Sequence, residues 1–181
     1  MKKIYLLIFI LSISESSASI KKNIIQNLNN INNLTFNFEQ NINGEVENGS
    51  CSIEYPKKIY CKYMLDNKKI LVSNGKSLVI KTSTSYYIYP LEKTPLSLIL
   101  DKNFLLNNIN KSKERLVDNK FINFSFFQND NEVNIFFDKN TYNLVGWQTL
   151  DVYQNLSITY LFSIIKNQKL NKNLFILPKK N

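Results

Sequence analysis

The sequence predicts a mainly β fold in which helices cover a strongly curved sheet or barrel. About eleven short segments of alternating apolar and polar residues follow one another with tight turns between them. Such short connections favour an antiparallel meander, because parallel strands need long crossovers, and many evenly spaced strands are typical of a barrel or a strongly curved sheet. Two segments, residues 20–33 and 91–109, show helical spacing instead.

The first helical segment has apolar residues on one side and a face of Asn and Lys on the other. Its apolar positions are Ile20, Ile24, Ile25, Leu28 and Ile31. This pattern predicts an amphipathic helix over residues 20–33.

The strands follow with a period of two residues. Leu34, Phe36 and Phe38 open the first strand, and Asn74-Gly75, a strong hairpin signal, joins the fourth and fifth strands. The second half of the chain continues the pattern in five segments, at residues 113–118, 121–127, 132–138, 142–151 and 155–162.

Residues 91–109 interrupt the meander. Thr94 is the expected helix N-cap, with Pro95 at the first helical position. The residues that follow are apolar nearly all round the helix, so more than one side of it must be covered. We therefore expect a helical lid over the sheet.

A hairpin at residues 136–151 presents the only tryptophan of the chain, Trp147, on an apolar face. This face is expected to line the concave side of the sheet, where the sheet meets the lid. Periodicity leaves open whether the lid seals a solid core or a cavity. A closed barrel of eight strands is filled by its own side chains, so eleven strands favour room inside.

The N-terminus has the organisation of a secretory signal peptide. Lys2-Lys3 precedes an apolar run from Ile4 to Ile13, and Ser16 and Ala18 fit the small-residue positions before a cleavage after Ala18. A membrane anchor is the weaker alternative, because this run is too short for a helix that crosses about 30 Å of hydrocarbon. We expect residues 1–18 to be a leader and residues 19–181 to form one domain exported to the periplasm.

A net charge of +9 is compatible with nucleic acid, anionic lipid or an acidic protein as a partner. The lysines are scattered, with pairs such as Lys57-Lys58 but no dense block, and the aromatic residues share faces with Ile, Leu and Val. Aromatic platforms for bases would be interleaved with Arg and Lys. We therefore expect a solvated basic surface and no nucleic-acid site.

Cys51 and Cys61 are the only cysteines, and they flank a turn signal at Pro56-Lys57-Lys58. The two residues share the parity of Ile53 and Ile59, so they are expected on one face, which suits a disulfide in an oxidising compartment. Two separate buried thiols are the alternative, since the hairpin register is unknown from the sequence.

The sequence lacks the usual groups of catalytic and metal sites. Histidine is absent, which excludes histidine-based acid–base catalysis and histidine metal ligands. Two cysteines cannot make a four-thiolate zinc site, and the four glycines are isolated, so no Gly-rich phosphate loop is present. We expect no catalytic residue, no metal, no cofactor and no enzymatic activity.

Five motifs follow one another along the chain. They are "FNFEQNINGEVENGSCSIEYPKKIYCKY", "KKILVSNGKSLVI", "LEKTPLSLIL", "FFDKNTYNLVGWQTLD" and "LNKNLFILP". In this order they resemble the motifs of the outer-membrane lipoprotein carrier proteins, the LolA-type periplasmic chaperones.

The resemblance implies a half-open antiparallel barrel of about eleven strands, closed by an N-terminal helix and a mid-chain helical lid. It also implies an apolar cavity that holds the acyl chains of lipoprotein cargo. Such a carrier receives its cargo from an inner-membrane ABC-type lipoprotein-releasing complex and delivers it to an outer-membrane lipoprotein receptor. We expect this carrier to be a monomer.

One position departs from the family pattern. The family commonly has an arginine before the hairpin proline, which hydrogen-bonds to the lid, whereas this chain has Tyr55 before Pro56. A tyrosine offers one hydroxyl and no charge, against five donors in a guanidinium group. Tyr55 is therefore the candidate lid latch, and another residue in that role is the alternative.

The candidate site residues are apolar residues of the strands and of the lid. The wall of the lipid-binding cavity is expected to consist of Leu34, Phe36, Phe38, Ile53, Ile59, Tyr63, Phe124, Phe126, Ile135, Phe137 and Trp147. The lid is expected to contribute Leu96, Leu98, Ile99, Leu100 and Phe104. Simple core packing is the alternative for each of these residues taken singly.

A second hypothesis keeps the fold and changes the function. The same half-barrel would then sense mislocalised lipid or lipoprotein in an envelope-stress response. Extraction of a lipoprotein from membrane vesicles would favour the carrier, and lipid-dependent binding to a signalling partner without extraction would favour the sensor.

Overall fold

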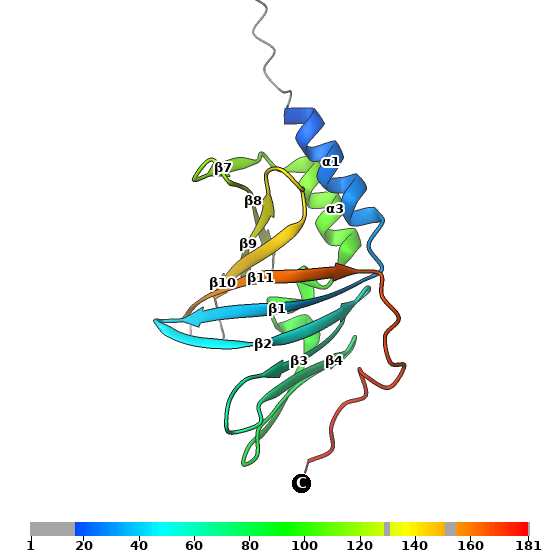
Figure 1. Ribbon diagram of the computed structural model, residues 1–181, viewed down its shortest axis with the longest axis vertical. Coiled ribbons are helices and arrows are strands. Elements are labelled where there is room, and N and C mark those ends of the chain that lie inside the picture. The colour runs from blue at the N-terminus through cyan, green and yellow to red at the C-terminus, as the bar shows by residue number, and fades with distance from the viewer. Residues whose placement is uncertain (1–16, 129–130, 151–154, 181) are drawn as a thin grey trace, which may run out of the picture.

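The computed structural model describes residues 17–128, 131–150 and 155–180, and Figure 1 shows a mainly β molecule. Its described residues form one antiparallel sheet of eleven strands, which confirms the predicted fold class. The strands are β1 (Asn33–Ile42), β2 (Glu45–Glu54), β3 (Lys58–Tyr63), β4 (Ile70–Asn74), β5 (Ser77–Lys81), β6 (Tyr86–Pro90), β7 (Arg115–Val117), β8 (Phe121–Gln128), β9 (Asn131–Asp138), β10 (Leu144–Leu150) and β11 (Leu156–Lys166).

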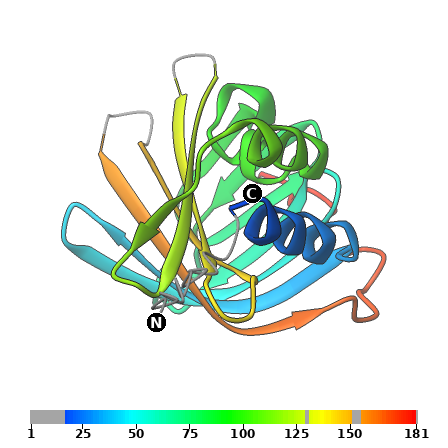
Figure 2. The same cartoon turned by 90° about the horizontal axis from the view of Figure 1, so that it is seen from above.

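The order of the strands explains why the barrel stays open. The sheet runs β6-β5-β4-β3-β2-β1-β11-β10-β9-β8-β7, so the first and last strands of the chain pair at its centre. The two edge strands, β6 and β7, are not paired with each other. The sheet curves strongly around the helices, as the view from above shows (Figure 2), and it is therefore a half-open barrel.

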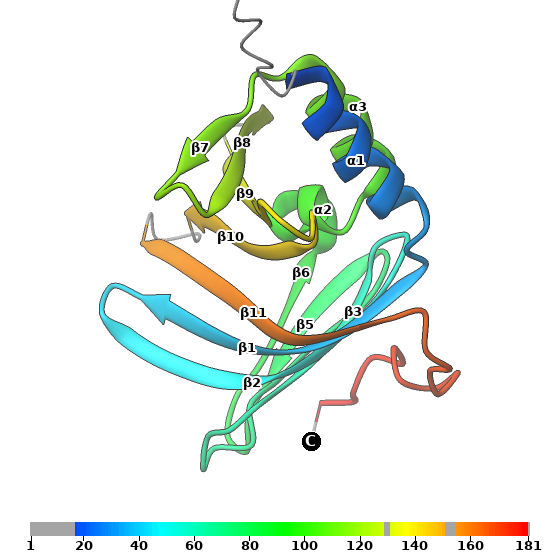
Figure 3. The ribbon, with the colours of Figure 1, turned by 45° about the horizontal axis from the view of Figure 1, so that its top comes forward.

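Three helices and a short 3-10 turn cover the concave side of the sheet (Figure 3). They are α1 (Ser17–Asn29), η1 (Leu91–Lys93), α2 (Leu96–Ile99) and α3 (Lys102–Lys111). Helix α1 lies beside α3. The predicted N-terminal helix thus exists, but it ends at Asn29 instead of residue 33, and the first strand begins at Asn33. Residues 1–16 of the predicted leader lie outside the described residues.

The lid segment is divided, whereas the sequence predicted a single helix. Asp101 has an extended backbone and its carboxylate accepts a hydrogen bond from the backbone N–H of Phe104 at 3.0 Å. Asp101 is thus the N-cap of α3 and starts a new helix. The N-cap position of α2 is Pro95, and the hydroxyl of Thr94 instead donates to the carbonyl oxygen of Leu91 at 2.8 Å.

Aromatic rings fill the core where β8 and β9 face the helices. Phe124 and Phe137 are fully buried, with their ring centroids 6.0 Å apart. Phe104 of α3 meets the ring of Phe126 edge-on at 5.9 Å. These are favourable distances for pairs of aromatic rings. Large rings from both layers therefore fill this end of the half-barrel.

Strand β11 reverses the usual pattern of polar and apolar residues. Its buried positions are Ser157, Thr159 and Leu161, whereas Leu156, Ile158, Tyr160 and Phe162 are exposed. Strand β1 fixes this register, since Phe38 pairs with Leu161 and Gln40 with Thr159. Two hydroxyl side chains consequently point to the concave side.

The C-terminal segment lies against the outer side of β3 to β5. The Nζ of Lys58 lies 5.8 Å from the ring centroid of Phe175, which is buried, and Lys81 donates to the carbonyl oxygen of Lys179 at 2.9 Å. Val72 and Val79 are buried as well, although the neighbouring Leu71 and Leu78 face the concave side. This part of the sheet is therefore covered on both faces.

Candidate functional site

A cavity of about 280 Å³ lies on the concave side, between the sheet and the start of the lid segment. Side chains of β1 to β6, β10, β11 and the turn into α2 line it. The lining residues are Phe38, Gln40, Ile42, Cys51, Ile59, Cys61, Tyr63, Lys69, Leu71, Leu78, Ile80, Tyr89, Thr94, Pro95, Leu96, Trp147, Thr149, Leu150, Ser157 and Thr159.

Most of this lining is apolar. Leu71, Leu78 and Ile80 come from the hairpin of β4 and β5, and Leu96 closes the cavity from the lid. Trp147 lies on the opposite side and meets the ring of Phe36 edge-on at 6.2 Å. The predicted position of Trp147, on the concave side near the lid, is the position it has.

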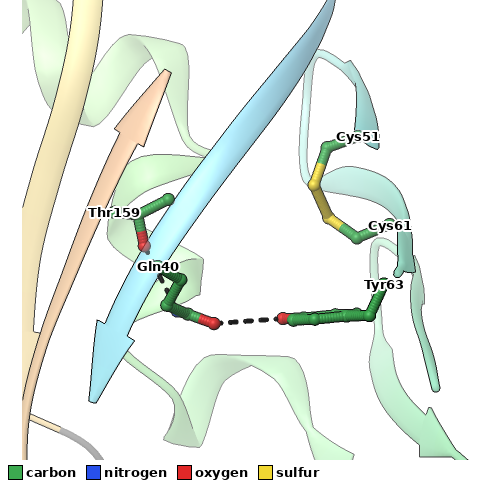
Figure 4. The surroundings of a disulfide bond; sticks show 5 residues. All are labelled: Gln40, Cys51, Cys61, Tyr63 and Thr159. Carbon is green, nitrogen blue, oxygen red and sulfur yellow. Dashed lines mark hydrogen bonds between the residues drawn. A yellow bond between two sulfur atoms is a disulfide. The ribbon is translucent and has the colours of Figure 1, made fainter. Parts of the chain in front are cut away.

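A disulfide forms part of the cavity wall (Figure 4). Cys51 of β2 and Cys61 of β3 are directly paired in the sheet register, with their Cα atoms 4.1 Å apart, and their sulfur atoms are bonded at 1.97 Å. Of the two alternatives for these cysteines, the structure contains the disulfide. It ties the two central strands of the wall together.

The cavity also has a polar end, which Figure 4 shows beside the disulfide. The Nε2 group of Gln40 donates to the hydroxyl oxygen of Thr159 at 3.2 Å. The same group donates to the hydroxyl oxygen of Ser157, which the figure does not draw, at 3.0 Å. Its Oε1 atom accepts a hydrogen bond from the hydroxyl of Tyr63 at 3.3 Å. Four side chains from three strands thus form one hydrogen-bonded network in an otherwise apolar wall.

Tyr63 keeps its proton in this network. Burial, and secondarily the negative charge of Glu47, raise the pKa of the Tyr63 phenol well above its ordinary value of 10.0. Both effects disfavour the phenolate. The hydroxyl is therefore a hydrogen-bond donor to Gln40 at neutral pH.

Lys69 is the charged residue that lines the cavity, and its charge is compensated. Its Nζ lies 2.6 Å from Oε2 of Glu47, and both side chains are about four-fifths buried. The same Nζ lies 4.2 Å from the ring centroid of Tyr63, which suits a cation–π contact. The polar end of the cavity therefore has no net charge from this pair.

Four of the predicted wall residues line this cavity, namely Phe38, Ile59, Tyr63 and Trp147. The other predicted wall residues are buried in the packed core and do not line it. These are Leu34, Phe36, Ile53, Phe124, Phe126, Ile135 and Phe137. Among the predicted lid residues, Leu96 lines the cavity, Leu98, Ile99 and Leu100 are buried in the core, and Phe104 packs on Phe126.

The sequence patterns did not predict the polar members of the lining, Gln40, Ser157 and Thr159. The reversed alternation of residues 155–162 was the available signal, because the hydroxyls there share the parity of Leu161 and not that of Tyr160 and Phe162. Only the pairing of β11 with β1 shows which of these two faces is the inner one.

Tyr55 does not join the hairpin to the lid by a hydrogen bond in this structure. Its hydroxyl is buried and has no hydrogen-bond partner among the described residues, and burial raises its pKa above the ordinary value. Lys57, two residues further on, makes this connection instead. Its backbone N–H donates to the carbonyl oxygen of Leu100 at 2.9 Å, and its Nζ lies 3.3 Å from Oδ2 of Asp101.

The described residues contain no cluster of three or more His, Cys, Asp or Glu side chains that could hold a metal ion. They also contain no helix of the length and apolar character that a membrane span requires.

An open antiparallel half-barrel with a mostly apolar cavity under a helical cover defines the class of this protein. The chain belongs to the family described as outer membrane lipoprotein carrier protein LolA, whose family model matches residues 29–177. No curated protein sequence matches the chain.

Solved structures share the fold at very low sequence identity. An uncharacterized conserved protein from Thermus thermophilus superposes with a TM-score of 0.52 at 8% identity, over 91% of this chain and 96% of the other. MucB superposes with a TM-score of 0.50 at 10% identity, over 91% of this chain and 64% of the other. At these identities the likeness shows the fold alone.

Proposed function

We propose that this protein is a periplasmic carrier that binds the acyl chains of lipoproteins and ferries them from the inner to the outer membrane. The observation that supports this proposal best is the apolar cavity of about 280 Å³ on the concave side of the half-barrel. Membership of the lipoprotein carrier family supports the acyl chains of lipoproteins as the ligand of this cavity. The signal-peptide pattern of residues 1–18 supports the periplasm as the compartment.

The chemistry of transfer needs burial of hydrocarbon and no covalent step. Each CH₂ group that leaves water for an apolar site contributes about 0.8 kcal/mol. An apolar wall that competes with the bilayer, and still releases its ligand, meets this requirement. The carrier is therefore proposed to have no enzymatic activity of its own.

The cavity must enlarge to hold complete cargo. Its volume of about 280 Å³ lies just below the range of roughly 300–1,000 Å³ that is usual for small-molecule sites, and a lipoprotein carries more than one acyl chain. The lid segment is the part of the wall that we propose to move, since Pro95 and Leu96 line the cavity from the N-cap and the first residue of α2, a helix of only four residues. Displacement of α2 would enlarge the cavity.

The ion pair between the hairpin and the lid opposes such a movement only weakly. The side chains of Lys57 and Asp101 are 45% and 29% exposed. Exposed ion pairs contribute about 0–1 kcal/mol. Cargo that buries apolar surface would repay the loss of this contact and shift the population toward the open form.

Binding and release of cargo require two partners, one that loads the carrier and one that accepts the cargo. An inner-membrane ABC-type complex would load the carrier, and an outer-membrane lipoprotein receptor would accept the cargo. The energy for extraction would come from the loading complex.

The test is extraction of a triacylated lipoprotein from membrane vesicles by the purified mature protein. We expect a soluble complex of carrier and lipoprotein in the supernatant after the vesicles are sedimented. Ile80→Trp, which places a large ring in the cavity, should abolish extraction. The matched control is Ile88→Trp on the exposed side of β6, which should extract like the wild type.

Two results would contradict the carrier. Extraction that persists in Ile80→Trp would mean that the cavity is not the binding site. Lipid-dependent binding to a protein partner, without release of lipoprotein from the vesicles, would instead support a sensor on the same half-barrel.

A further inference from the structure

We propose that the network of Gln40, Tyr63, Ser157 and Thr159 recognises the carbonyl oxygen of an acyl ester or amide. This inference rests on the proposed function, because it concerns the same cavity. It adds a polar contact to the burial of hydrocarbon, and it assigns the ligand class as acyl chains with a carbonyl group at one end.

The two hydroxyls lie where an apolar side chain would serve a pure hydrocarbon site better. Ser157 and Thr159 are only 6% and 4% exposed, and both line the cavity. A buried hydroxyl has a desolvation cost unless it is hydrogen-bonded. Gln40 donates to the oxygen of each hydroxyl, but neither O–H has an acceptor among the described residues. Alanine and valine would fill these positions of a strand without a buried O–H that needs an acceptor, so the hydroxyls indicate a polar group in the ligand.

The direction of the hydrogen bonds defines the kind of polar group. Gln40 uses its Nε2 group on the two hydroxyl oxygens, and its Oε1 atom accepts from Tyr63. Neither Ser157 nor Thr159 donates a hydrogen bond to another described residue, so each still has one O–H to offer toward the cavity. The network therefore has donors left over, which fit an acceptor oxygen.

A neutral acceptor fits better than an anion. The cation that lines the cavity, Lys69, already lies 2.6 Å from the carboxylate of Glu47. A phosphate at the network would approach this carboxylate with no free positive charge from Lys69. A carbonyl oxygen has no charge and accepts two hydrogen bonds, which matches the two hydroxyls.

The surroundings of the network place hydrocarbon next to the carbonyl. Thr159 is directly paired with Trp147 and Ser157 with Thr149 in the register of β10 and β11. Phe38 lies two residues before Gln40 on β1 and also lines the cavity. A ligand held at the network would thus have its chain between aromatic rings and the Leu71–Leu78 wall.

The experiment compares two probes that differ in one carbonyl group. The ester probe is 1-palmitoylglycerol, and the ether probe is 1-O-hexadecylglycerol. The wild type should bind the ester roughly three- to tenfold more tightly, which corresponds to the usual net effect of one or two hydrogen bonds. In Ser157→Ala/Thr159→Val the ratio of the two affinities should fall to about one, while Ser50→Ala on the outer face of β2 should keep the wild-type ratio.

Thr159→Val alone provides a second measurement, should the double variant unfold. Its ratio of ester to ether affinity should lie between the wild-type ratio and one. Equal binding of both probes by the wild type, or an unchanged ratio in the variants, would overturn the carbonyl contact and leave the apolar cavity in place. Failure of the wild type to bind either probe would overturn the proposed function as well.

Two lipids could supply the carbonyl, and competition separates them. A synthetic triacylated lipopeptide and dipalmitoyl phosphatidylglycerol both contain acyl esters, but only the phospholipid brings a phosphate. We expect the lipopeptide to displace 1-palmitoylglycerol at the lower concentration, because Lys69, the cation of the described lining, is already paired with Glu47 and is not free for a phosphate. The reverse order would overturn the assignment of a neutral acceptor.

Discussion

The two ends of the concave face are covered in different ways. At the packed end, which comprises β8 and β9 with α1 and α3, large rings from both layers interlock, as Phe104, Phe124, Phe126 and Phe137 do. At the hollow end, which comprises β1 to β6, β10 and β11 with the start of α2, a cavity of about 280 Å³ remains. One continuous sheet therefore supports a solid core and a binding cavity side by side.

The difference comes from the length of the covering helices. Helices α1 and α3 have 13 and 10 residues and lie together over the packed end. Helix α2 has four residues and reaches only the edge of the hollow end. A short cover cannot deliver enough side chains to fill the space beneath it.

The largest expected effect is on the free energy of unfolding, when one phenylalanine from each end is replaced by alanine. Phe124→Ala, at the packed end, should lower the free energy of unfolding by about 3–5 kcal/mol, because a large cavity would open in a filled core. Phe38→Ala should cost less, because Phe38 already faces empty space in the cavity. Urea unfolding of the two variants measures the difference.

Ligand binding should separate the same two variants in the opposite sense. The folded fraction of Phe124→Ala should bind an acyl probe with the affinity of the wild type. Phe38→Ala changes the lining of the cavity, so its affinity for the probe should differ from that of the wild type. Equal losses of stability in the two variants would show that the hollow end is as tightly packed as the other.

The next effect concerns the disulfide at the hollow end. Cys51→Ala/Cys61→Ala should lower the free energy of unfolding by about 2–3 kcal/mol, since the bond closes a loop with a sequence separation of 10. Unfolding of the wild type in the presence of a reductant should show a loss of similar size. If the reduced wild type is as stable as the oxidised protein, the disulfide does not contribute to the free energy of unfolding.

The sequence predicted the strands better than it predicted the two ends. Local patterns are sufficient for a strand or a hairpin, as at Asn74-Gly75, where Gly75 has a positive φ of 97° and β4 turns into β5. Local patterns also placed Cys51 and Cys61 on one face.

The sequence did not predict which residues line the cavity, because this depends on contacts between distant segments. Phe124 and Phe137 face the concave side as expected, but α3 decides whether they line a cavity, and α3 starts where Asp101 divides the lid. Ser157 and Thr159 belong to the site because β11 pairs with β1, more than 100 residues earlier in the chain. No pattern within either segment contains this register.

A smaller effect is expected at the contact between the hairpin and the lid. Lys57→Ala removes the ion pair with Asp101 but keeps the backbone hydrogen bond to Leu100. The free energy of unfolding should fall by less than about 1 kcal/mol. The only tryptophan of the chain, Trp147, lines the cavity under α2, so its fluorescence should become easier to quench with acrylamide.

Tyr55→Phe is the matched control for this prediction. Because the Tyr55 hydroxyl has no partner among the described residues, its removal should not increase quenching. If Tyr55→Phe exposes Trp147 more than Lys57→Ala does, Tyr55 is the lid latch after all.

The smallest effect is expected at the packed end, in the turn between β9 and β10. The backbone N–H of Thr141 above all lowers the pKa of Asp138 below its ordinary value of 3.8, together with the hydroxyl of Thr141 and the backbone N–H of Asn140. Because the pKa is lower in the folded state, the ionised form contributes stability above the unfolded pKa. That contribution is lost as the pH falls through the folded pKa.

Asp138→Asn keeps an acceptor oxygen and removes the charge, so its stability should fall less steeply than that of the wild type below about pH 4. The difference at pH 7 should stay below about 1 kcal/mol, because the turn is exposed and solvent screens the charge. Urea unfolding between pH 2 and pH 7 measures both quantities. Probe binding at neutral pH should be unchanged, because the turn lies away from the cavity lining; a loss of binding in this variant would show that the packed end and the hollow end are coupled.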